Sequence, residues 1–176
     1  MSEHGDVTVR PVRNEDHAEI QRLLKVAFGG PDEAVLVDLL RGNGDMLLEL
    51  AALRDARIAG CIAFSRAWIE TAAERVPVAC LAPVAVDPAC QSRGIGAELV
   101  RRGPAMLEKM QETVVFVLGE PGYYSRFGFV SKAAQSFPSQ FSEAASDAHM
   151  IKQSADRQPI PPGRLVYSAA FDAVSG

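Results

Sequence analysis

A glycine-bearing stretch, "QSRGIG" from Gln91 to Gly96, follows a long apolar run and leads into a helical pattern. Such a strand-to-helix corner places several backbone N–H groups at the positive end of a helix dipole, where an anion is favoured. Gly94 and Gly96 have no Cβ, so the backbone there can approach a phosphate closely. Taken alone, a single G-x-G is more typical of a plain turn, and both interpretations stay open for this stretch.

Two other phosphate-binding motifs do not fit. A dinucleotide-binding G-x-G-x-x-G would require glycine at the position of Leu99, and the G-K-[ST] of a P-loop occurs nowhere in the chain. Basic residues such as Arg93, Arg101 and Arg126 fall between Asp87 and Lys132, which permits a local anion site without proving one.

The elements that must position this corner form a mixed α/β order. The residue pattern predicts strands at 7–12, 46–53, 57–67, 76–86, 113–118 and 164–171, and helices at 14–28, 31–42, from 96 onward and at 120–127. Asn14 is the expected N-cap of the first helix. The stretch 131–163 has no clear periodicity.

Two prolines should disturb these elements. Pro83 cannot donate to a β-ladder, so it predicts a break or a bulge about three residues before the strand at 76–86 ends. Pro104 falls inside the helix that follows "QSRGIG", and it predicts a kink or an early end of that helix.

The composition is that of a globular protein, and we expect one domain over residues 1–176. Apolar residues make up 48% and charged residues 23%, which excludes a disordered chain, and the net charge of −4 argues against general nucleic-acid binding. No apolar run approaches the roughly 20 residues of a membrane span, and no secretory signal precedes the first strand, so we expect a cytoplasmic protein. The cysteines Cys61, Cys80 and Cys90 and the scattered histidines predict neither disulfides nor a metal site.

Two motifs in order carry a family resemblance. "LAPVAVDPACQSRGIGAELV" contains Q-x-x-G-x-G after a strand with a broken ladder, and "VVFVLGEPGYYSRFGF" contains Y-x-x-x-G-F. Together they resemble the GNAT superfamily of acyl-CoA-dependent N-acyltransferases over essentially the whole chain, and a late "VYSAAF" is similar to a branch of predicted N-acetyltransferases. The resemblance implies a mixed, mostly antiparallel sheet of six to seven strands with splayed central parallel strands, flanked by about four helices.

The resemblance also implies a binding site for acetyl-CoA as co-substrate. Backbone amides from Arg93 to Ala97 would hold the pyrophosphate, with Gln91 at the leading position of the motif and Ser92 where many relatives have glycine. The pantetheine arm would lie along the end of the broken strand. The full expected set is Val84, Ala85, Val86, Gln91, Ser92, Arg93, Gly94, Ile95, Gly96, Ala97, Tyr124 and Arg126.

Tyr124 is the tyrosine of Y-x-x-x-G-F, which the resemblance places near the thioester sulfur. A tyrosine with an ordinary pKa of about 10 is protonated at neutral pH and can therefore donate a proton to a departing thiolate. A packing role for the ring is the alternative. The neighbouring Tyr123 is expected to be structural.

The base that accepts the proton of the amine is not evident. No acid occurs between Val76 and Val86, where the family commonly has a glutamate. Glu120, Glu70 and Glu74 are candidates, acting directly or through water, and a water chain without a dedicated base is an equal alternative. Of these, Glu120 follows the strand at 113–118 and is the catalytic partner that we expect for Tyr124.

These observations predict an acetyltransferase. We expect an acetyl group to pass from acetyl-CoA to a primary amine of a small molecule or peptide, by direct attack in a ternary complex. One alternative is a non-catalytic acyl-CoA-binding or sensing module, and another is a cysteine hydrolase that uses Cys80 and His149. The sequence does not identify the amine or the acyl-chain preference. It is compatible with a homodimer.

Overall fold

The computed structural model describes residues 7–143 and 145–175. In chain order its elements are β1 (Thr8–Pro11), η1 (Asn14–Asp16), α1 (His17–Phe28), α2 (Asp32–Gly42), β2 (Met46–Arg54), β3 (Arg57–Glu70), β4 (Arg75–Val86), η2 (Pro88–Cys90), α3 (Ile95–Lys109), β5 (Val114–Leu118), α4 (Pro121–Tyr124), η3 (Ser125–Phe127), α5 (Ser131–Ala134), β6 (His149–Gln153), β7 (Arg164–Val166) and η4 (Ala169–Val174), where η denotes a 3₁₀-helix. Among the described helices, none is long and apolar enough to cross a membrane.

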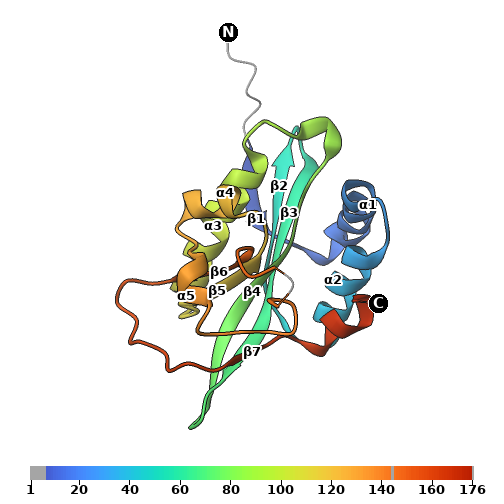
Figure 1. The fold of residues 1–176 in the computed structure, drawn as a ribbon. Helices are drawn as coiled ribbons and strands as arrows, with labels where there is room; N and C mark the ends of the chain where they lie inside the picture. The colour runs from blue at the N-terminus through green and yellow to red at the C-terminus, as the bar shows by residue number, and fades with distance from the viewer. Residues whose placement is uncertain (1–6, 144, 176) are drawn as a thin grey trace.

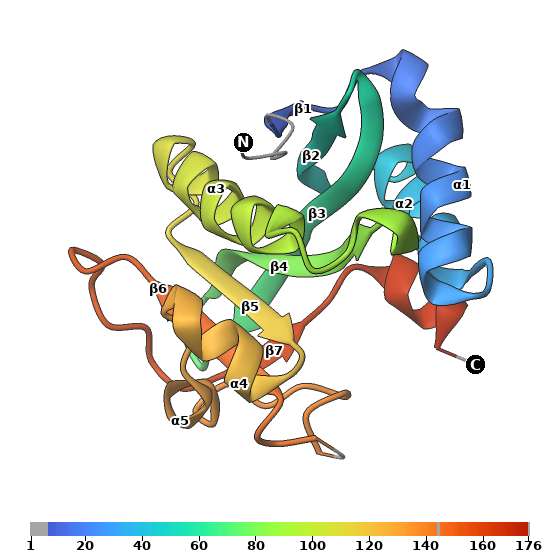
Figure 2. The ribbon, with the colours of Figure 1, turned by 90° about the horizontal axis from the view of Figure 1, so that it is seen from above.

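The strands form one sheet in the order β1-β2-β3-β4-β5-β6, with β7 paired to β3. Neighbouring strands are antiparallel except for β4 and β5, which are parallel. One face packs against α3 and α4, and the other against α1, α2 and η4 (Figures 1 and 2). The predicted mixed, mostly antiparallel sheet with a parallel central pair is confirmed. The described residues form five α-helices, of which α4 and α5 are a single turn long.

Two long hairpins build the centre of the sheet. β2 and β3 are joined by Asp55 and Ala56, whose φ angles of 50° and 61° are those that a tight hairpin turn requires at both positions. β3 extends to Glu70, beyond its predicted end at residue 67, and returns into β4 through a turn. In that turn the Thr71 hydroxyl accepts a hydrogen bond from the Glu74 amide at 3.0 Å. β4 consequently keeps β3 as a partner along almost its entire length.

The ladder of β4 is interrupted at Pro83, as predicted. Ile62 pairs with Val84 and Phe64 pairs with Leu81, so Ala82 and Pro83 together lie opposite Ala63 in a bulge. The Ala82–Pro83 peptide bond is cis. On the other edge of β4, pairing with β5 covers only residues 79–81 against 115–117. β4 therefore leaves β5 at the position of the bulge, and the two strands diverge beyond it.

The first helices differ from the prediction at their start. Asn14 is not the N-cap of a continuous helix, because residues 14–16 form the separate 3₁₀ turn η1. The capping carboxylate is that of Asp16, which accepts a hydrogen bond from the Arg13 amide at 2.7 Å. α1 then ends at Gly29, which has a φ of 73°. α1 and α2 both bury apolar side chains against the sheet: Ile20, Leu23, Leu24, Ala34 and Val37.

Pro104 does not end α3. The helix continues from Ile95 to Lys109, starting one residue before the predicted Gly96, and its buried side packs on β2, β3 and β4. Gly103, next to the proline, packs closely against Phe64. The contact is so tight that a Cβ at Gly103 would lie 2.3 Å from the Phe64 ring. We attribute the tolerance of Pro104 to this packing, since tertiary contacts can outweigh one lost backbone hydrogen bond.

The last third of the chain contains structure that the residue pattern did not reveal. β6 lies within the stretch 131–163 and pairs with the whole of β5. The predicted closing strand at 164–171 is wrong in its second half. Only Arg164–Val166 pairs with β3, and Ala169–Val174 forms η4, which packs against α2.

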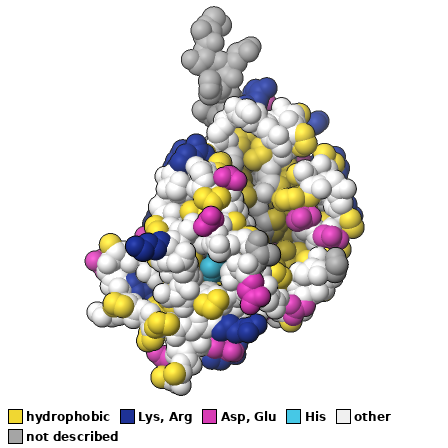
Figure 3. Space-filling view, viewed as in Figure 1, with side chains coloured by type: hydrophobic (Ala, Val, Ile, Leu, Met, Phe, Trp, Pro, Cys, Tyr) yellow, Lys and Arg dark blue, Asp and Glu magenta, His cyan; other side chains and the backbone are white. Residues whose placement is uncertain are grey.

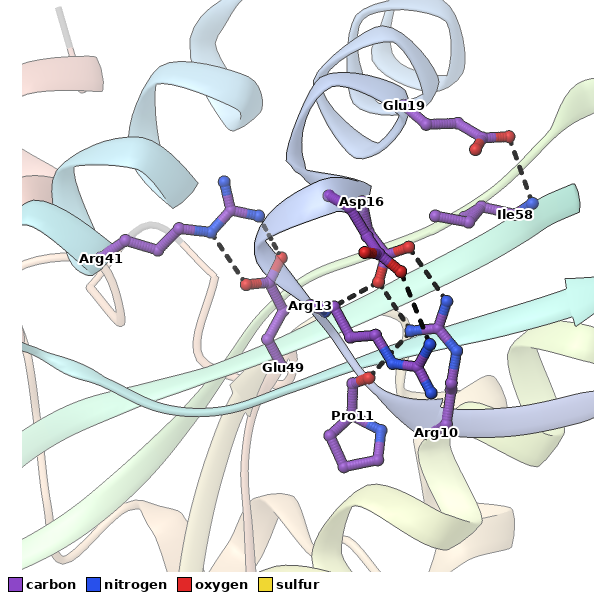
Figure 4. A network of polar contacts seen from close by, with 9 residues as sticks. Arg10, Pro11, Arg13, Asp16, Glu19, Arg41, Glu49 and Ile58 are labelled. Carbon is purple, nitrogen blue, oxygen red and sulfur yellow. Dashed lines mark hydrogen bonds and ion pairs between the residues drawn. The ribbon is translucent and has the colours of Figure 1, made fainter.

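Charged side chains tie the N-terminal elements to the sheet (Figure 4). Arg10 on β1 donates two hydrogen bonds to Asp16, at 2.6 and 3.0 Å. Arg41 on α2 donates two to Glu49 on β2, at 2.9 and 2.6 Å. These bidentate pairs hold η1 and α2 in place against the sheet edge.

The Arg10–Asp16 pair should make folding stability depend on acid. The hydrogen bond from Arg10 lowers the pKa of Asp16 to about 2. A lowered folded-state pKa contributes stability above the ordinary pKa near 4 that is lost as the pH falls through about 2. We expect Asp16→Asn to lower the free energy of unfolding by about 1 to 2 kcal/mol at pH 7, with the difference from wild type shrinking below pH 4. Urea unfolding between pH 7 and pH 2.5 measures this.

Glu15→Gln is the matched control, because Glu15 is exposed and, within the described residues, pairs only with the exposed Arg13. It should change the unfolding free energy little at any pH. A difference between Asp16→Asn and wild type that stays constant from pH 7 to pH 2.5 would contradict the assignment of this stability to the ionised pair.

Candidate active site

The divergence of β4 from β5 creates an opening whose wall is the end of β4. Val84 and Val86 pack with the cluster under α3, whereas Ala85 faces the cluster under α1. Along the β5 side these residues have no strand partner among the described residues. Their backbone amides and carbonyls on that edge are therefore available to hydrogen-bond a chain-like ligand. Figure 3 shows a hollow between the α3/α4 side and the α1/α2 side, with hydrophobic side chains on its walls.

The corner between β4 and α3 presents backbone donors. Within the described residues, the amides from Ser92 to Ala97 donate no hydrogen bond to another protein group. Gly94 has a φ of 79° and Ser92 a φ of 60°, so the loop turns twice through the left-handed region. At Ser92 this explains why glycine is the more common residue in the resembling family. The unpaired amides at the start of α3 form a concave donor surface suited to a phosphate.

The side chains of this corner are mostly exposed. Gln91 reaches back along the strand, and its Nε2 lies 3.5 Å from the Val86 carbonyl oxygen. Arg93 is exposed and makes no ion pair with another described residue. Ile95 is buried against Gly60, where an added Cβ would lie 2.9 Å from the Ile95 side chain. Close approach at Gly60 thus sets how near the start of α3 sits to the sheet.

Tyr124 lies on the α3 side of the opening, with its ring buried and only 8% of the residue exposed. The ring packs edge-on against Tyr123 and Phe129 and closely over Gly119, where a Cβ would meet it at 2.4 Å. Burial raises the pKa of Tyr124 to about 12. Its hydroxyl has no protein partner in the described part of the chain, and it is not among the fully enclosed polar atoms. The group is therefore a protonated phenol with its hydroxyl free to meet a ligand.

Tyr123 lies beside the start of α3, a position that the sequence did not indicate. Its hydroxyl lies 3.1 Å from the position of a Cβ at Gly96, so it overhangs the first turn of α3. Arg126 stacks over its ring at 4.7 Å and donates from Nε to its carbonyl oxygen at 3.3 Å. No sequence motif marks Tyr123 as a site residue, because its closeness to Gly96 of α3 arises only from tertiary packing.

The structure separates the candidate bases. Glu120 is the N-cap of α4, exposed, and accepts a hydrogen bond from the Gly122 amide at 3.4 Å, one turn before Tyr124. Glu70 and Glu74 lie at the β3–β4 turn, about 26 Å along β4 from Pro83 at ~3.3 Å per residue. Glu70 is paired with Arg75, and Glu74 lines a cavity of about 730 Å³ at that far end. Of the three, only Glu120 lies beside the opening.

The cysteine-hydrolase alternative has no geometric basis. Burial raises the pKa of the Cys80 thiol to about 12, which disfavours the nucleophilic thiolate. His149 stacks on Phe116 with ring centroids 5.5 Å apart, and its Nε2 contacts the Phe137 carbonyl oxygen at 2.8 Å. Phe116 pairs with Cys80 in the sheet, so it separates the thiol from the imidazole.

In residues 7–143 and 145–175, no cluster of three or more metal-ligating side chains occurs.

Comparisons with known proteins agree with this geometry. A family model described as acetyltransferase (GNAT) domain matches residues 8–131. The uncharacterized N-acetyltransferase YhbS of Escherichia coli strain K12 is 32% identical over 143 residues, covering 80% of this chain and 84% of that protein. A GNAT family acetyltransferase from Brucella melitensis, solved with acetyl-CoA, is 32% identical with a TM-score of 0.79, covering 96% of this chain and 100% of the other. Escherichia coli YhbS, solved with CoA, is 28% identical with a TM-score of 0.88, covering 98% and 95%.

The clearance at Gly119 predicts a specific loss of stability. A Cβ there would overlap the Tyr124 ring, so we expect Gly119→Ala to lower the free energy of unfolding by about 1 to 3 kcal/mol. Gly122→Ala, three residues further along in α4, is the control, because the nearest atom to its Cβ would be 3.6 Å away. Urea unfolding of both variants measures the difference. Equal stability of the two would show that the Tyr124 ring is not confined by Gly119.

Proposed function

Because the chain belongs to the GNAT family of acetyltransferases and is an N-acetyltransferase, we propose that it moves an acetyl group from acetyl-CoA to a primary amine of a small molecule or peptide. The transfer is a direct attack in a ternary complex. The observation that carries this proposal is the alignment of three features along one opening: unpaired amides at the start of α3, an unpaired edge of β4 and the free hydroxyl of Tyr124.

Acetyl-CoA fits the groups that the opening offers. The amides from Ser92 to Ala97 would hold the pyrophosphate, with Gln91 and Arg126 at the border of the same corner. The free edge of β4 at Val84 to Val86 would pair with the amides of the pantetheine arm. Two relatives support this ligand, since one was solved with acetyl-CoA and the other with CoA.

Tyr124 would act as the general acid. In the reaction the amine nitrogen bonds to the acetyl carbonyl carbon, and the bond from that carbon to sulfur breaks. The leaving thiolate must gain a proton, and a phenol with a raised pKa holds its proton at neutral pH until a strong base appears beside it. A backbone amide of β4 beyond Leu81 would stabilise the charge that develops on the carbonyl oxygen.

Glu120 would receive the proton that the amine loses, directly or through a water molecule. It is the described acid nearest in sequence to Tyr124, and its exposed carboxylate stands at the end of β5 beside the opening. No covalent acetyl-enzyme takes part. This agrees with Cys61 and Cys80, because burial raises the pKa of both thiols to about 12.

Removing the Tyr124 hydroxyl should slow the transfer without weakening donor binding. We expect Tyr124→Phe to lower kcat about 100-fold while the Kd of CoA changes less than about twofold. Thiol release measured against amino acids, polyamines, aminoglycosides and short peptides gives kcat, and calorimetry gives the Kd. Tyr167→Phe is the matched control, because Tyr167 packs with the cluster on the other face of the sheet and its hydroxyl is enclosed. Unchanged turnover in Tyr124→Phe would remove the general acid from the proposal.

Glu120→Gln separates a carboxylate base from a water chain. With Glu120 as base, we expect kcat/KM for the amine to fall about 10- to 100-fold. Glu143→Gln, a change at another exposed acid, is the control. A Glu120→Gln enzyme with wild-type kcat/KM would assign the proton to solvent water.

A further inference from the structure

A cluster of two arginines and two aromatic rings lies next to the start of α3. The centre of this cluster is the pair of rings of Tyr123 and Phe127. Arg126 stacks over both, with its Cζ 4.7 Å from the first centroid and 5.1 Å from the second. Arg101 reaches the Phe127 ring from α3, with its Cζ 5.8 Å from the centroid. Two guanidinium groups from separate elements therefore converge on one aromatic surface.

The two guanidinium groups retain donors for a ligand. Arg126 uses Nε for the Tyr123 carbonyl oxygen, and its remaining nitrogens have no partner among the described residues. Arg101 shares a single carboxylate, that of Glu98, with Arg102. Its side chain is 61% exposed. On α3 one acid, Glu98, faces two arginines, and Arg126 has no ion pair among the described residues. This surface therefore carries an excess of positive charge.

The position of Arg101 and Arg126 relative to the amides at the start of α3 limits which anion can bind. The Tyr123 hydroxyl overhangs Gly96 in the first turn of α3, and its ring continues the surface from there to Arg126. A ligand whose first phosphate group occupies the amides would therefore meet the arginines a short distance further along. Stacked, planar guanidinium groups suit a phosphate monoester, which offers several acceptor oxygens and close to two negative charges.

We infer that Arg101 and Arg126, mounted on the rings of Tyr123 and Phe127, bind the ribose 3′-phosphate of CoA and so select CoA thioesters over those that lack this phosphate. The inference rests on the proposed use of acetyl-CoA. It adds a specificity determinant to a site whose backbone amides would hold any pyrophosphate. Arg93, exposed in the loop itself, would contact the pyrophosphate side and not discriminate.

The test compares two donors that differ only in this phosphate, acetyl-CoA and acetyl-dephospho-CoA. For the wild type we expect a KM at least about tenfold lower for acetyl-CoA, which corresponds to one charge-assisted contact, and similar kcat values. Arg126→Gln and Arg101→Gln should each raise the KM of acetyl-CoA several-fold and raise that of acetyl-dephospho-CoA by less, so that the ratio of the two KM values falls toward one. The donor preference should also shrink as potassium chloride is raised.

Arg102→Gln is the matched control, because Arg102 is the next residue on α3 and shares Glu98 but contacts neither ring. It should keep the wild-type donor preference. Equal KM values for the two donors in the wild type, or a preference that survives in both Arg101→Gln and Arg126→Gln, would overturn the inference. So would a preference lost only in Arg102→Gln.

Calorimetry with CoA and dephospho-CoA separates this inference from the proposed reaction. A wild type that binds CoA about tenfold more tightly than dephospho-CoA but acetylates none of the amines would contradict the proposed reaction and support the phosphate subsite. A wild type that acetylates an amine equally well from both donors would support the reaction and overturn the subsite.

Discussion

The missing N–H of Pro83 is the constraint on which the site depends. A proline in the middle of a sheet removes a ladder donor, and here the strand accommodates it by a bulge against Ala63. Pairing with β5 stops at Leu81, directly before the bulge. Because β3 continues to hold β4 on its other edge, the end of β4 stays ordered while its β5 edge is left open. An opening thus arises in the centre of the sheet without a loss of overall order.

Close contacts at glycine bring the helices to this opening. Gly60 admits Ile95, Gly103 admits the Phe64 ring and Gly119 admits the Tyr124 ring. Each contact fixes a distance that a single methyl group would change, since close-packed interiors resist added volume. The start of α3 and the phenol of Tyr124 consequently flank one opening, although they belong to segments joined only through β5.

Unpaired polar groups line the opening at two positions. The amides of Ser92 to Ala97 and the hydroxyl of Tyr124 have no protein partners among the described residues, and both lie on the α3 side. Buried or constrained polar groups without partners are costly unless a ligand or water satisfies them. The arginines on Tyr123 and Phe127 add charge to these groups, because Arg126 has no ion pair among the described residues and Arg101 shares one carboxylate, that of Glu98, with Arg102.

The sequence by itself determined what local rules encode. Period-two and helical patterns located most elements, Pro83 located the break, and the glycines after α1 and in "QSRGIG" located turns. Y-x-x-x-G-F, read through the family resemblance, pointed to Tyr124. Only the tertiary structure decided which of these meet, because neighbours separated by many residues are set by strand register and packing. It placed Glu70 and Glu74 far from the opening, revealed β6 as the partner of β5, and brought Tyr123 over Gly96. Even the tolerance of Pro104 follows from buried packing on the sheet, which no pattern within the helix records.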